Sequence, residues 1–125
     1  MRHEKWLKFC MKIVSRSRSH HYKHVSVLMK SGRILAIAWN RNDRPGRLRY
    51  AFYGDRGWHS ELNVLYKFKP EEIKDAVLYT IGVNQNGNLV HSCPCPQCQQ
   101  LIRLYKLRAV YYMNKSGQVE QLKIS

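Results

Sequence analysis

The sequence is poor in acidic residues and has no long apolar run. It carries 8 Asp and Glu against 22 Lys and Arg, which gives a formal net charge of +14. Because no apolar stretch reaches roughly eighteen residues, we expect no membrane-spanning helix and no membrane partner. The N-terminus begins with charged residues and lacks the apolar segment of a secretory signal. These absences together predict a cytoplasmic protein.

Cysteine is also scarce, and most of it is clustered. The chain has four cysteines, of which Cys93, Cys95 and Cys98 lie close together and Cys10 stands apart. Without a secretory signal a disulfide is less expected than a metal site. A cluster of this kind therefore directs attention to metal chemistry in a reducing compartment.

Two short motifs, read together, carry the strongest functional signal. His59 and Glu61 form an H-x-E pair, and Pro94, Cys95 and Cys98 follow it as P-C-x-x-C. In this order they match the signature of zinc-dependent base deaminases. A catalytic zinc site keeps three protein ligands and one open position, and His59, Cys95 and Cys98 would be those ligands.

The chemistry of hydrolytic deamination explains these residue types. The reaction needs hydroxide at neutral pH, and bound Zn²⁺ supplies it by lowering the pKa of water. Glu61 would act as acid and base, moving a proton from the water to the ring nitrogen and the leaving ammonia. Cys95 and Cys98 are three residues apart at a predicted helix start, so they share one face. That helix end also favours the thiolate form.

Other interpretations of the same residues stay open. His59 could be a surface histidine and Glu61 a solvated helix charge. The clustered cysteines could form a structural zinc knuckle with His91 as a fourth ligand. Cys93 could replace Cys95 as a ligand, although the motif favours Cys95.

The motifs and their flanks resemble the cytidine deaminase superfamily over about residues 5–114. That superfamily includes free cytidine and deoxycytidylate deaminases, tRNA adenosine deaminases and the AID/APOBEC polynucleotide deaminases. Residues 23–27 and 32–40 are similar to the first hairpin of the deoxycytidylate and tRNA adenosine enzymes. The resemblance implies that Asn40 contacts the substrate sugar and that the backbone at Ser92 and Cys93 accepts the amine of the base. Residues 108–112 resemble the AID/APOBEC strand that leads into the base-selecting loop. Tyr112 is thus a candidate stacking residue or an ordinary strand aromatic, and Trp58 is a further candidate substrate contact.

The pattern predicts one domain over residues 1–125, with the α/β fold of this superfamily. We expect a three-layer α/β/α sandwich whose mixed sheet has about five strands, the fourth of them parallel to its neighbour. Three helices are predicted. The first is an amphipathic segment whose core face carries Trp6, Phe9, Cys10, Ile13 and Val14. The other two cover residues 59–68 and residues 96–106. The predicted strands cover residues 23–29, 34–39, 76–83, 107–113 and 119–124, with an extra hairpin at residues 84–91.

Three finer expectations concern burial. Residues 34–39 are apolar on both faces, so we expect this strand inside the sheet with helices on both sides. Leu62, Leu65 and Tyr66 should face the core, with Pro70 ending their helix. Residues 69–75 should form a solvated turn.

Positive charge is concentrated in the first half of the chain. Residues 1–56 hold 14 basic and 3 acidic residues, and residues 57–125 hold 8 and 5. Such a field attracts polyanions, although a merely solvated basic surface is the plain alternative. Residues 41–58 combine five arginines with four aromatics, a mixture suited to single-stranded nucleic acid. The candidate phosphate contacts are Arg16, Arg18, His21, Arg41, Arg44, Arg47 and Arg49.

These observations predict a zinc-dependent hydrolase that converts cytosine to uracil, with single-stranded DNA or RNA as the first choice of substrate. A free deoxycytidine nucleotide is the main alternative, followed by adenosine in tRNA and by a non-catalytic, nucleic-acid-binding zinc protein. The resembling family usually adds one or two helices at the C-terminal end, and we expect this chain to lack them. The uncovered sheet edge makes a homo-oligomer possible.

Overall fold

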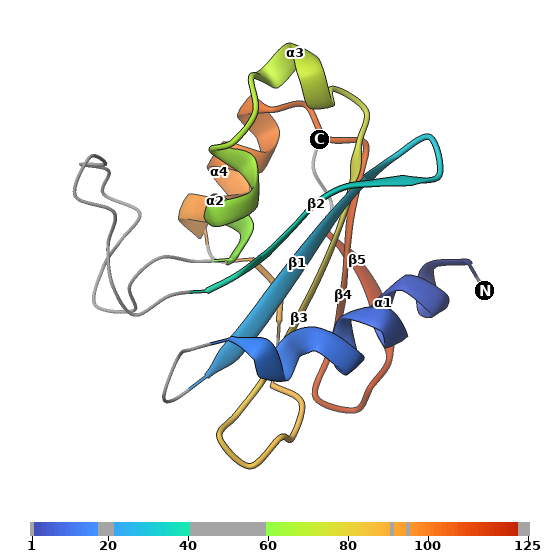
Figure 1. Cartoon of the computed structure of the whole chain (residues 1–125), viewed down its shortest axis with the longest axis vertical. Coiled ribbons are helices and arrows are strands. Elements are labelled where there is room, and N and C mark those ends of the chain that lie inside the picture. The colour runs from blue at the N-terminus through green and yellow to red at the C-terminus, as the bar shows by residue number, and fades with distance from the viewer. Residues whose placement is uncertain (1, 18–21, 41–59, 91, 95, 123–125) are drawn as a thin grey trace.

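A five-stranded sheet forms the centre of the molecule. The computed structural model describes residues 2–17, 22–40, 60–90, 92–94 and 96–122 (Figure 1). The strand order is β2-β1-β3-β4-β5. The strands are β1 (Lys23–Lys30), β2 (Arg33–Trp39), β3 (Val77–Val83), β4 (Ala109–Met113) and β5 (Val119–Leu122).

The sheet is mixed, as the sequence predicts. Strand β1 pairs antiparallel with both β2 and β3, and β5 pairs antiparallel with β4. Strands β3 and β4 are parallel, with Val77 opposite Ala109 and Thr80 opposite Tyr112. The chain between them contains helix α4 (Pro96–Leu104), which supplies the crossover that a parallel pair requires. The predicted parallel fourth strand is therefore confirmed.

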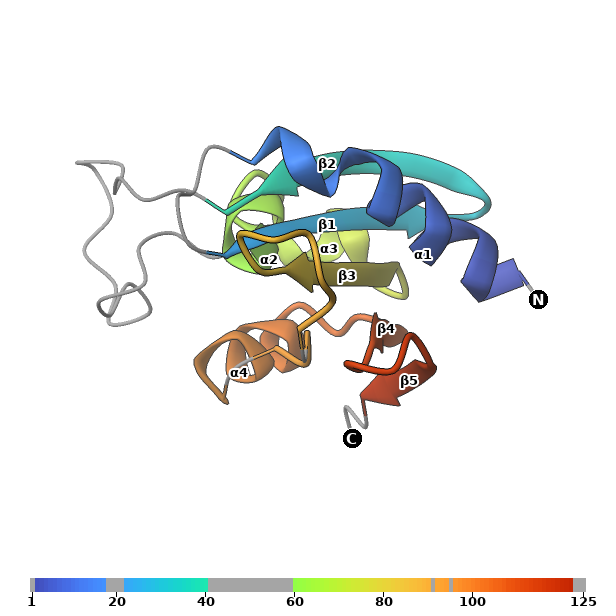
Figure 2. The ribbon, with the colours of Figure 1, turned by 90° about the horizontal axis from the view of Figure 1, so that it is seen from below.

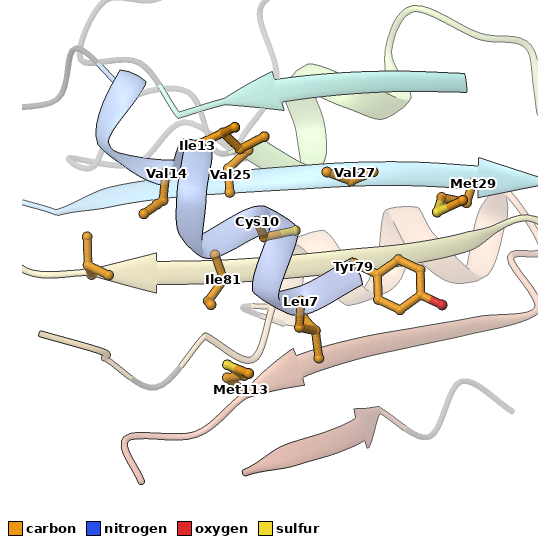
Figure 3. Packing of buried hydrophobic residues seen from close by; sticks show 11 residues of the cluster. Leu7, Cys10, Ile13, Val14, Val25, Val27, Met29, Tyr79, Ile81 and Met113 are labelled. Atoms are coloured by element: carbon orange, nitrogen blue, oxygen red, sulfur yellow. The ribbon is translucent and has the colours of Figure 1, made fainter. Parts of the chain in front are cut away.

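Helices cover both faces of the sheet. Helix α1 (Arg2–Ile13), followed by the short 3₁₀ helix η1 (Val14–Arg16), lies on one face, and α2 (Ser60–Leu65) and α4 lie on the other (Figures 1 and 2). Each face has its own apolar cluster. Figure 3 shows the cluster under α1, and the second cluster joins α2, α3 (Pro70–Ile73) and α4 to the opposite face. The predicted three-layer α/β/α sandwich is confirmed.

The buried face of α1 is shifted relative to the prediction. Leu7 and Cys10 are fully buried, and Ile13 and Val14 nearly so (Figure 3). Trp6 and Phe9 are only partly buried and lie edge-to-face at the rim of this cluster. The apolar stripe is thus centred on Leu7. The prediction omitted this residue because it took the larger Trp6 and Phe9 as the core positions.

The prediction that residues 34–39 lie inside the sheet is wrong. Among the described strands, β2 lies at one edge and pairs only with β1. Ile34 and Leu35 at its start are exposed, whereas Ala38 is buried near its end. Helices therefore cover only the second half of this strand, on both sides. An apolar run reports burial but does not distinguish an edge strand from an interior one.

The segment after α2 also departs from expectation. Helix α2 ends at Leu65, and Tyr66 is 45% exposed rather than inward, while Val64 is fully buried. Pro70 does not end this helix but begins α3, where a missing N–H costs nothing. The Glu72 carboxylate accepts the Lys69 backbone N–H at 2.7 Å and caps this short helix. The predicted turn at residues 69–75 is therefore a helical turn.

The inserted segment after β3 folds back on the strand, as predicted. Val83 forms an antiparallel bridge with Leu89, and the Asn84 N–H donates to the Asn88 carbonyl oxygen at 2.9 Å. Gly87 takes a positive φ of 83°, which the tight turn requires. In the described part of the chain, no helix is both long and apolar enough to cross a membrane.

Candidate active site

Glu61 is a buried carboxylate at the start of a helix. It lies in the first turn of α2 and is 7% exposed, next to Ser60, which is fully buried. Ser60 Oγ donates a hydrogen bond to Glu61 Oε1 at 2.7 Å. A carboxylate in this position is stabilised by the free N–H groups of the helix end. Its burial shows that Glu61 is not the solvated helix charge of the plain alternative.

Two further hydroxyls extend from Ser60 into the sheet. Ser26 Oγ of β1 lies 2.9 Å from Ser60 Oγ and 3.0 Å from Thr80 Oγ1 of β3. Both residues are essentially inaccessible to solvent. The motif gives no sign of this contact, because the three residues are far apart in the sequence. The only trace in the sequence is one hydroxyl residue in each of two apolar strands.

Cys98 occupies the matching position on the neighbouring helix. It lies in the first turn of α4, two residues after Pro96, and its side chain is 1% exposed. Helices α2 and α4 pack against each other, and their N-terminal ends lie at the same end of the sheet (Figure 1). Glu61 and Cys98 therefore lie in the first turns of two adjacent helices. The N-terminal ends of both helices are directed toward the same region of the molecule.

Two of the three predicted zinc ligands, His59 and Cys95, lie outside the described residues. His59 directly precedes Ser60 and Cys95 directly precedes Pro96, so each is joined to the start of one of the two helices. One imidazole and two thiols are a donor set that suits a catalytic zinc ion. The buried thiol of Cys98, at a helix N-terminus that favours thiolate, fits that ion.

Tyr112 and Cys93 meet beside this site. Tyr112, on β4, is 8% exposed and forms a hydrogen bond with the Cys93 side chain. Burial, this bond and the charges of Cys93 and Glu120 raise the pKa of Tyr112 to about 12. The Gln99 amide lies 3.9 Å from Cys93 Sγ and donates to the Pro94 carbonyl oxygen at 2.7 Å. The segment with Cys93 and Pro94, which the prediction places against the base, thus has contacts with side chains of both β4 and α4.

Asn40 ties together the loops at the end of β2. Its Oδ1 accepts from Ser17 Oγ at 2.6 Å and from the His24 N–H at 2.9 Å, and its Nδ2 donates to the Tyr22 carbonyl oxygen at 2.9 Å. An amide nitrogen carries two hydrogens, and Tyr22 uses one of them. The predicted contact between Asn40 and the substrate sugar would therefore use the other amide hydrogen.

Ser92 has a structural partner of its own. Its buried hydroxyl accepts from the Gly82 N–H at 2.8 Å and donates to the Val90 carbonyl oxygen at 2.9 Å. These bonds fix the start of the cysteine segment to the end of β3. The backbone of Ser92 and Cys93 is thereby presented at the same end of the sheet as the start of α4.

The predicted nucleic-acid contacts fall mostly outside the described residues. Arg16 is exposed at the end of η1. Trp58, the other candidate substrate contact, is also outside that part of the chain. The remaining candidates outside it are Arg18, His21, Arg41, Arg44, Arg47 and Arg49.

Comparison with known proteins connects this geometry to a family. Residues 1–114 match the family model described as the cytidine and deoxycytidylate deaminase zinc-binding region. The chain belongs to this deaminase family. The predicted superfamily membership is therefore confirmed. No curated protein matches the sequence closely enough to count as a relative.

Solved structures of deaminases share the fold of this family member. The dCMP deaminase from the cyanophage S-TIM5, in apo form, is 26% identical with a TM-score of 0.62, over 90% of this chain and 82% of that chain. Its complex with dCMP and dUMP is also 26% identical with a TM-score of 0.62, over 89% and 79%. Cytidine deaminase from Mycobacterium leprae, 19% identical with a TM-score of 0.54 over 92% and 88%, shows the fold alone.

Proposed function

We propose that the protein is a zinc-dependent hydrolase that removes the amino group of the cytosine base in a deoxycytidine nucleotide. The observation that carries this proposal is the buried carboxylate of Glu61 at the start of α2, with the Cys98 thiol at the start of the adjacent α4. The similarity to a deaminase solved with dCMP and dUMP supports a free nucleotide as substrate. It supports this substrate better than the polynucleotide that the sequence placed first.

The proposed roles follow from the positions of the residues. His59, Cys95 and Cys98 hold Zn²⁺, which when bound lowers the pKa of water to near neutrality. Glu61 takes a proton from the attacking water and delivers it to the ring nitrogen of the base. The carbon that bears the amino group gains an oxygen, and its bond to nitrogen breaks. Glu61 then takes the proton of the newly bound hydroxyl, so that a carbonyl forms, and transfers it to the departing amine, which leaves as ammonia.

The substrate contacts are proposed on the same basis. The backbone at Ser92 and Cys93 faces the amino group of the base, and Tyr112 supports this segment from β4 through Cys93. Asn40 reaches the sugar with its second amide hydrogen while its other contacts hold the loop. Trp58, the residue before His59 in the sequence, is proposed as a further substrate contact.

A second candidate substrate, cytosine in single-stranded nucleic acid, is favoured by one specific observation. The outer face of α1 carries a surface pocket of about 450 Å³ lined by Lys5, Lys8, Lys12, Trp6, Phe9 and Glu4. Where lysines lie beside aromatic rings, the lysines can bind phosphate groups and the rings can stack on bases. Together with the net charge of +14, this face would attract a polynucleotide.

Substitution of Glu61 tests the proposed chemistry. Glu61→Gln should reduce kcat on dCMP by about 10²- to 10⁴-fold, the usual cost of losing a general acid–base group. Zinc content, measured by mass spectrometry of the metal, should stay near that of the unmodified protein. Glu71→Gln, an exposed glutamate on α3, is the matched control and should turn over normally. Normal turnover by Glu61→Gln would contradict the proposed mechanism.

Substitution of Cys98 tests the metal assignment without depending on activity. Cys98→Ser removes one thiolate, and the zinc retained after dialysis should fall well below that of the unmodified chain. Cys10→Ser, at the buried cysteine of α1, is the control and should retain its zinc. Equal zinc retention in both variants would remove Cys98 from the ligand set.

A further inference from the structure

A continuous row of buried hydroxyls runs from the sheet to Glu61. It begins at the Val25 carbonyl oxygen and passes through Thr80 Oγ1, Ser26 Oγ and Ser60 Oγ to Glu61 Oε1. The successive oxygen–oxygen distances are 3.3, 3.0, 2.9 and 2.7 Å. All three hydroxyl residues are at most 1% exposed. The contacts shorten steadily toward the carboxylate.

The number of hydrogens limits how this row can be bonded. Three hydroxyls carry three hydrogens, whereas the row contains four oxygen–oxygen contacts. When Ser60 donates to Glu61 and Thr80 donates to the Val25 carbonyl oxygen, Ser26 can donate either to Thr80 or to Ser60. If Ser26 donates to Ser60, the hydrogens of Ser26 and Ser60 both point toward Glu61. The contact left without a hydrogen is then the one between Ser26 and Thr80, at 3.0 Å.

The two shortest contacts, at 2.9 and 2.7 Å, are the ones whose hydrogens point toward Glu61 in that arrangement. A hydroxyl bonded to a carboxylate is shorter than one bonded to a neutral oxygen, and 2.7 Å is a typical distance. Hydroxyls in a row polarise one another in the same direction. The strand positions themselves would accept apolar residues, since Leu28 and Leu78, two residues away on the same face of the sheet, are fully buried and apolar. The hydroxyls are thus unexpected for packing alone.

We propose that Thr80, Ser26 and Ser60 are positioning residues that fix Glu61 Oε1 and leave Oε2 to carry the proton during deamination. This inference rests on the proposed function. The row is anchored in β1 and β3, two interior strands of the sheet, so the carboxylate takes its orientation from the buried centre of the fold. A hydroxyl donates and accepts, so the contact of Ser60 can persist after Glu61 takes up its proton.

The test compares variants that differ by one hydroxyl. Ser60→Ala should lower kcat on dCMP by about 10- to 100-fold, the range expected when a reacting group is misplaced by up to an ångström. KM and zinc content should change less than about twofold, because Ser60 is neither a proposed zinc ligand nor a proposed substrate contact. Thr80→Val keeps the shape of threonine and removes its hydroxyl, so kcat should fall by a few-fold. Thr80→Ser restores the hydroxyl and should recover most of that loss.

A packing control separates positioning from general destabilisation. Val64→Ala lies on α2 in the same apolar cluster and removes no hydroxyl. Assayed well below its unfolding temperature, it should keep a kcat close to that of the unmodified chain. Equal losses in Thr80→Val and Thr80→Ser, or an unchanged kcat in Ser60→Ala, would overturn the positioning role.

Crystal structures of the unmodified protein and Ser60→Ala decide the question even without turnover. The positioning role predicts one Glu61 conformation in the first structure and a shifted or split carboxylate in the second. An identical carboxylate in both would contradict it. If the unmodified protein converts no cytosine substrate, the proposed function fails, while these two structures still judge the hydroxyl row.

Discussion

Cys10 is a titratable side chain that the proposed chemistry does not use. It is fully buried on the inner face of α1, and that burial raises the pKa of its thiol to about 12, from an ordinary value of 9.0 (Figure 3). A thiol with so high a pKa is protonated, and therefore unreactive, at neutral pH. Cys10 thus acts as a small apolar core residue, in contrast to Cys98 at its helix N-terminus.

This difference gives a pH prediction at the residue scale. Below pH 9, Cys10 is protonated in both the folded and unfolded states, so its contribution to stability is fully present. Above pH 9 the unfolded thiol ionises first, and this contribution is lost as the pH rises toward 12. The stability of the unmodified protein relative to Cys10→Ala should therefore fall with a slope approaching about 1.4 kcal/mol per pH unit. Urea unfolding at pH 8 and pH 10.5 measures it, and a constant difference would contradict the burial of a neutral thiol.

At this scale the sequence indicates Glu61 and Cys98 but not their supports. Spacing along the chain identifies the motif residues, because the chemistry constrains which types occur near one another in sequence. Ser26, Ser60 and Thr80 meet only through the pairing of β1 with β3 and the packing of α2. Such long-range contacts leave no local pattern to read. His59 and Cys95 remain predictions from the motif.

At the scale of elements, the pairing of β1 with β3 includes one unusually close packing contact. His24 lies opposite Gly82, and a methyl group at Gly82 would overlap the His24 ring. The same glycine donates its N–H to Ser92 Oγ at the start of the cysteine segment. Glycine is therefore needed here for space rather than for an unusual backbone conformation.

Substitution of this glycine tests the contact. Gly82→Ala should destabilise the fold by about 1–3 kcal/mol, the usual cost of overpacking a tight site. Adding His24→Ala removes the ring that the new methyl would meet. The double variant should then be clearly more stable than the sum of the two single effects predicts. Thermal unfolding of all four proteins measures this, and strict additivity would show that the His24 ring is not what excludes a side chain at Gly82.

The order of the helices and strands is largely readable from the sequence, but their place in the sheet is less so. Alternation and apolar runs predict all five strands, and Pro96 predicts the start of α4. Position at an edge depends on which strands pair, so β2 was expected in the interior. Helix α3 was missed because it is a single turn whose capping glutamate, Glu72, lies in a polar segment.

At the scale of the whole molecule, the net charge and the face of α1 are the features that would act on a polyanion. The chain has 22 basic and 8 acidic residues, and a positive field of this kind attracts polyanions. Lys8 pairs only weakly with Glu4, at 3.5 Å on an exposed surface, and Lys5 lies over the Trp6 ring at 5.3 Å. The lysines of α1 thus remain accessible to phosphate.

A salt titration tests this face. Binding of a single-stranded oligonucleotide should weaken steeply between 50 and 200 mM salt, as phosphate contacts release counterions. Replacing Lys5, Lys8 and Lys12 with Gln should reduce the slope of log K against log salt by about 2, since each single-strand contact contributes about 0.7. Replacing Lys67, Lys74 and Lys115, which are equally charged and exposed, is the control. Equal effects of the two triple variants would show non-specific attraction by the whole surface.

The central claim is the removal of the amino group from a free cytosine nucleotide. Its most direct test is to incubate the zinc-loaded protein separately with dCMP and with a cytosine-containing single-stranded oligonucleotide, and to detect the uracil products by mass spectrometry. We predict conversion of dCMP to dUMP, which Glu61→Gln abolishes. Conversion of the oligonucleotide alone would contradict the nucleotide assignment and make a polynucleotide the substrate. Conversion of neither, with zinc bound, would contradict the proposed activity itself.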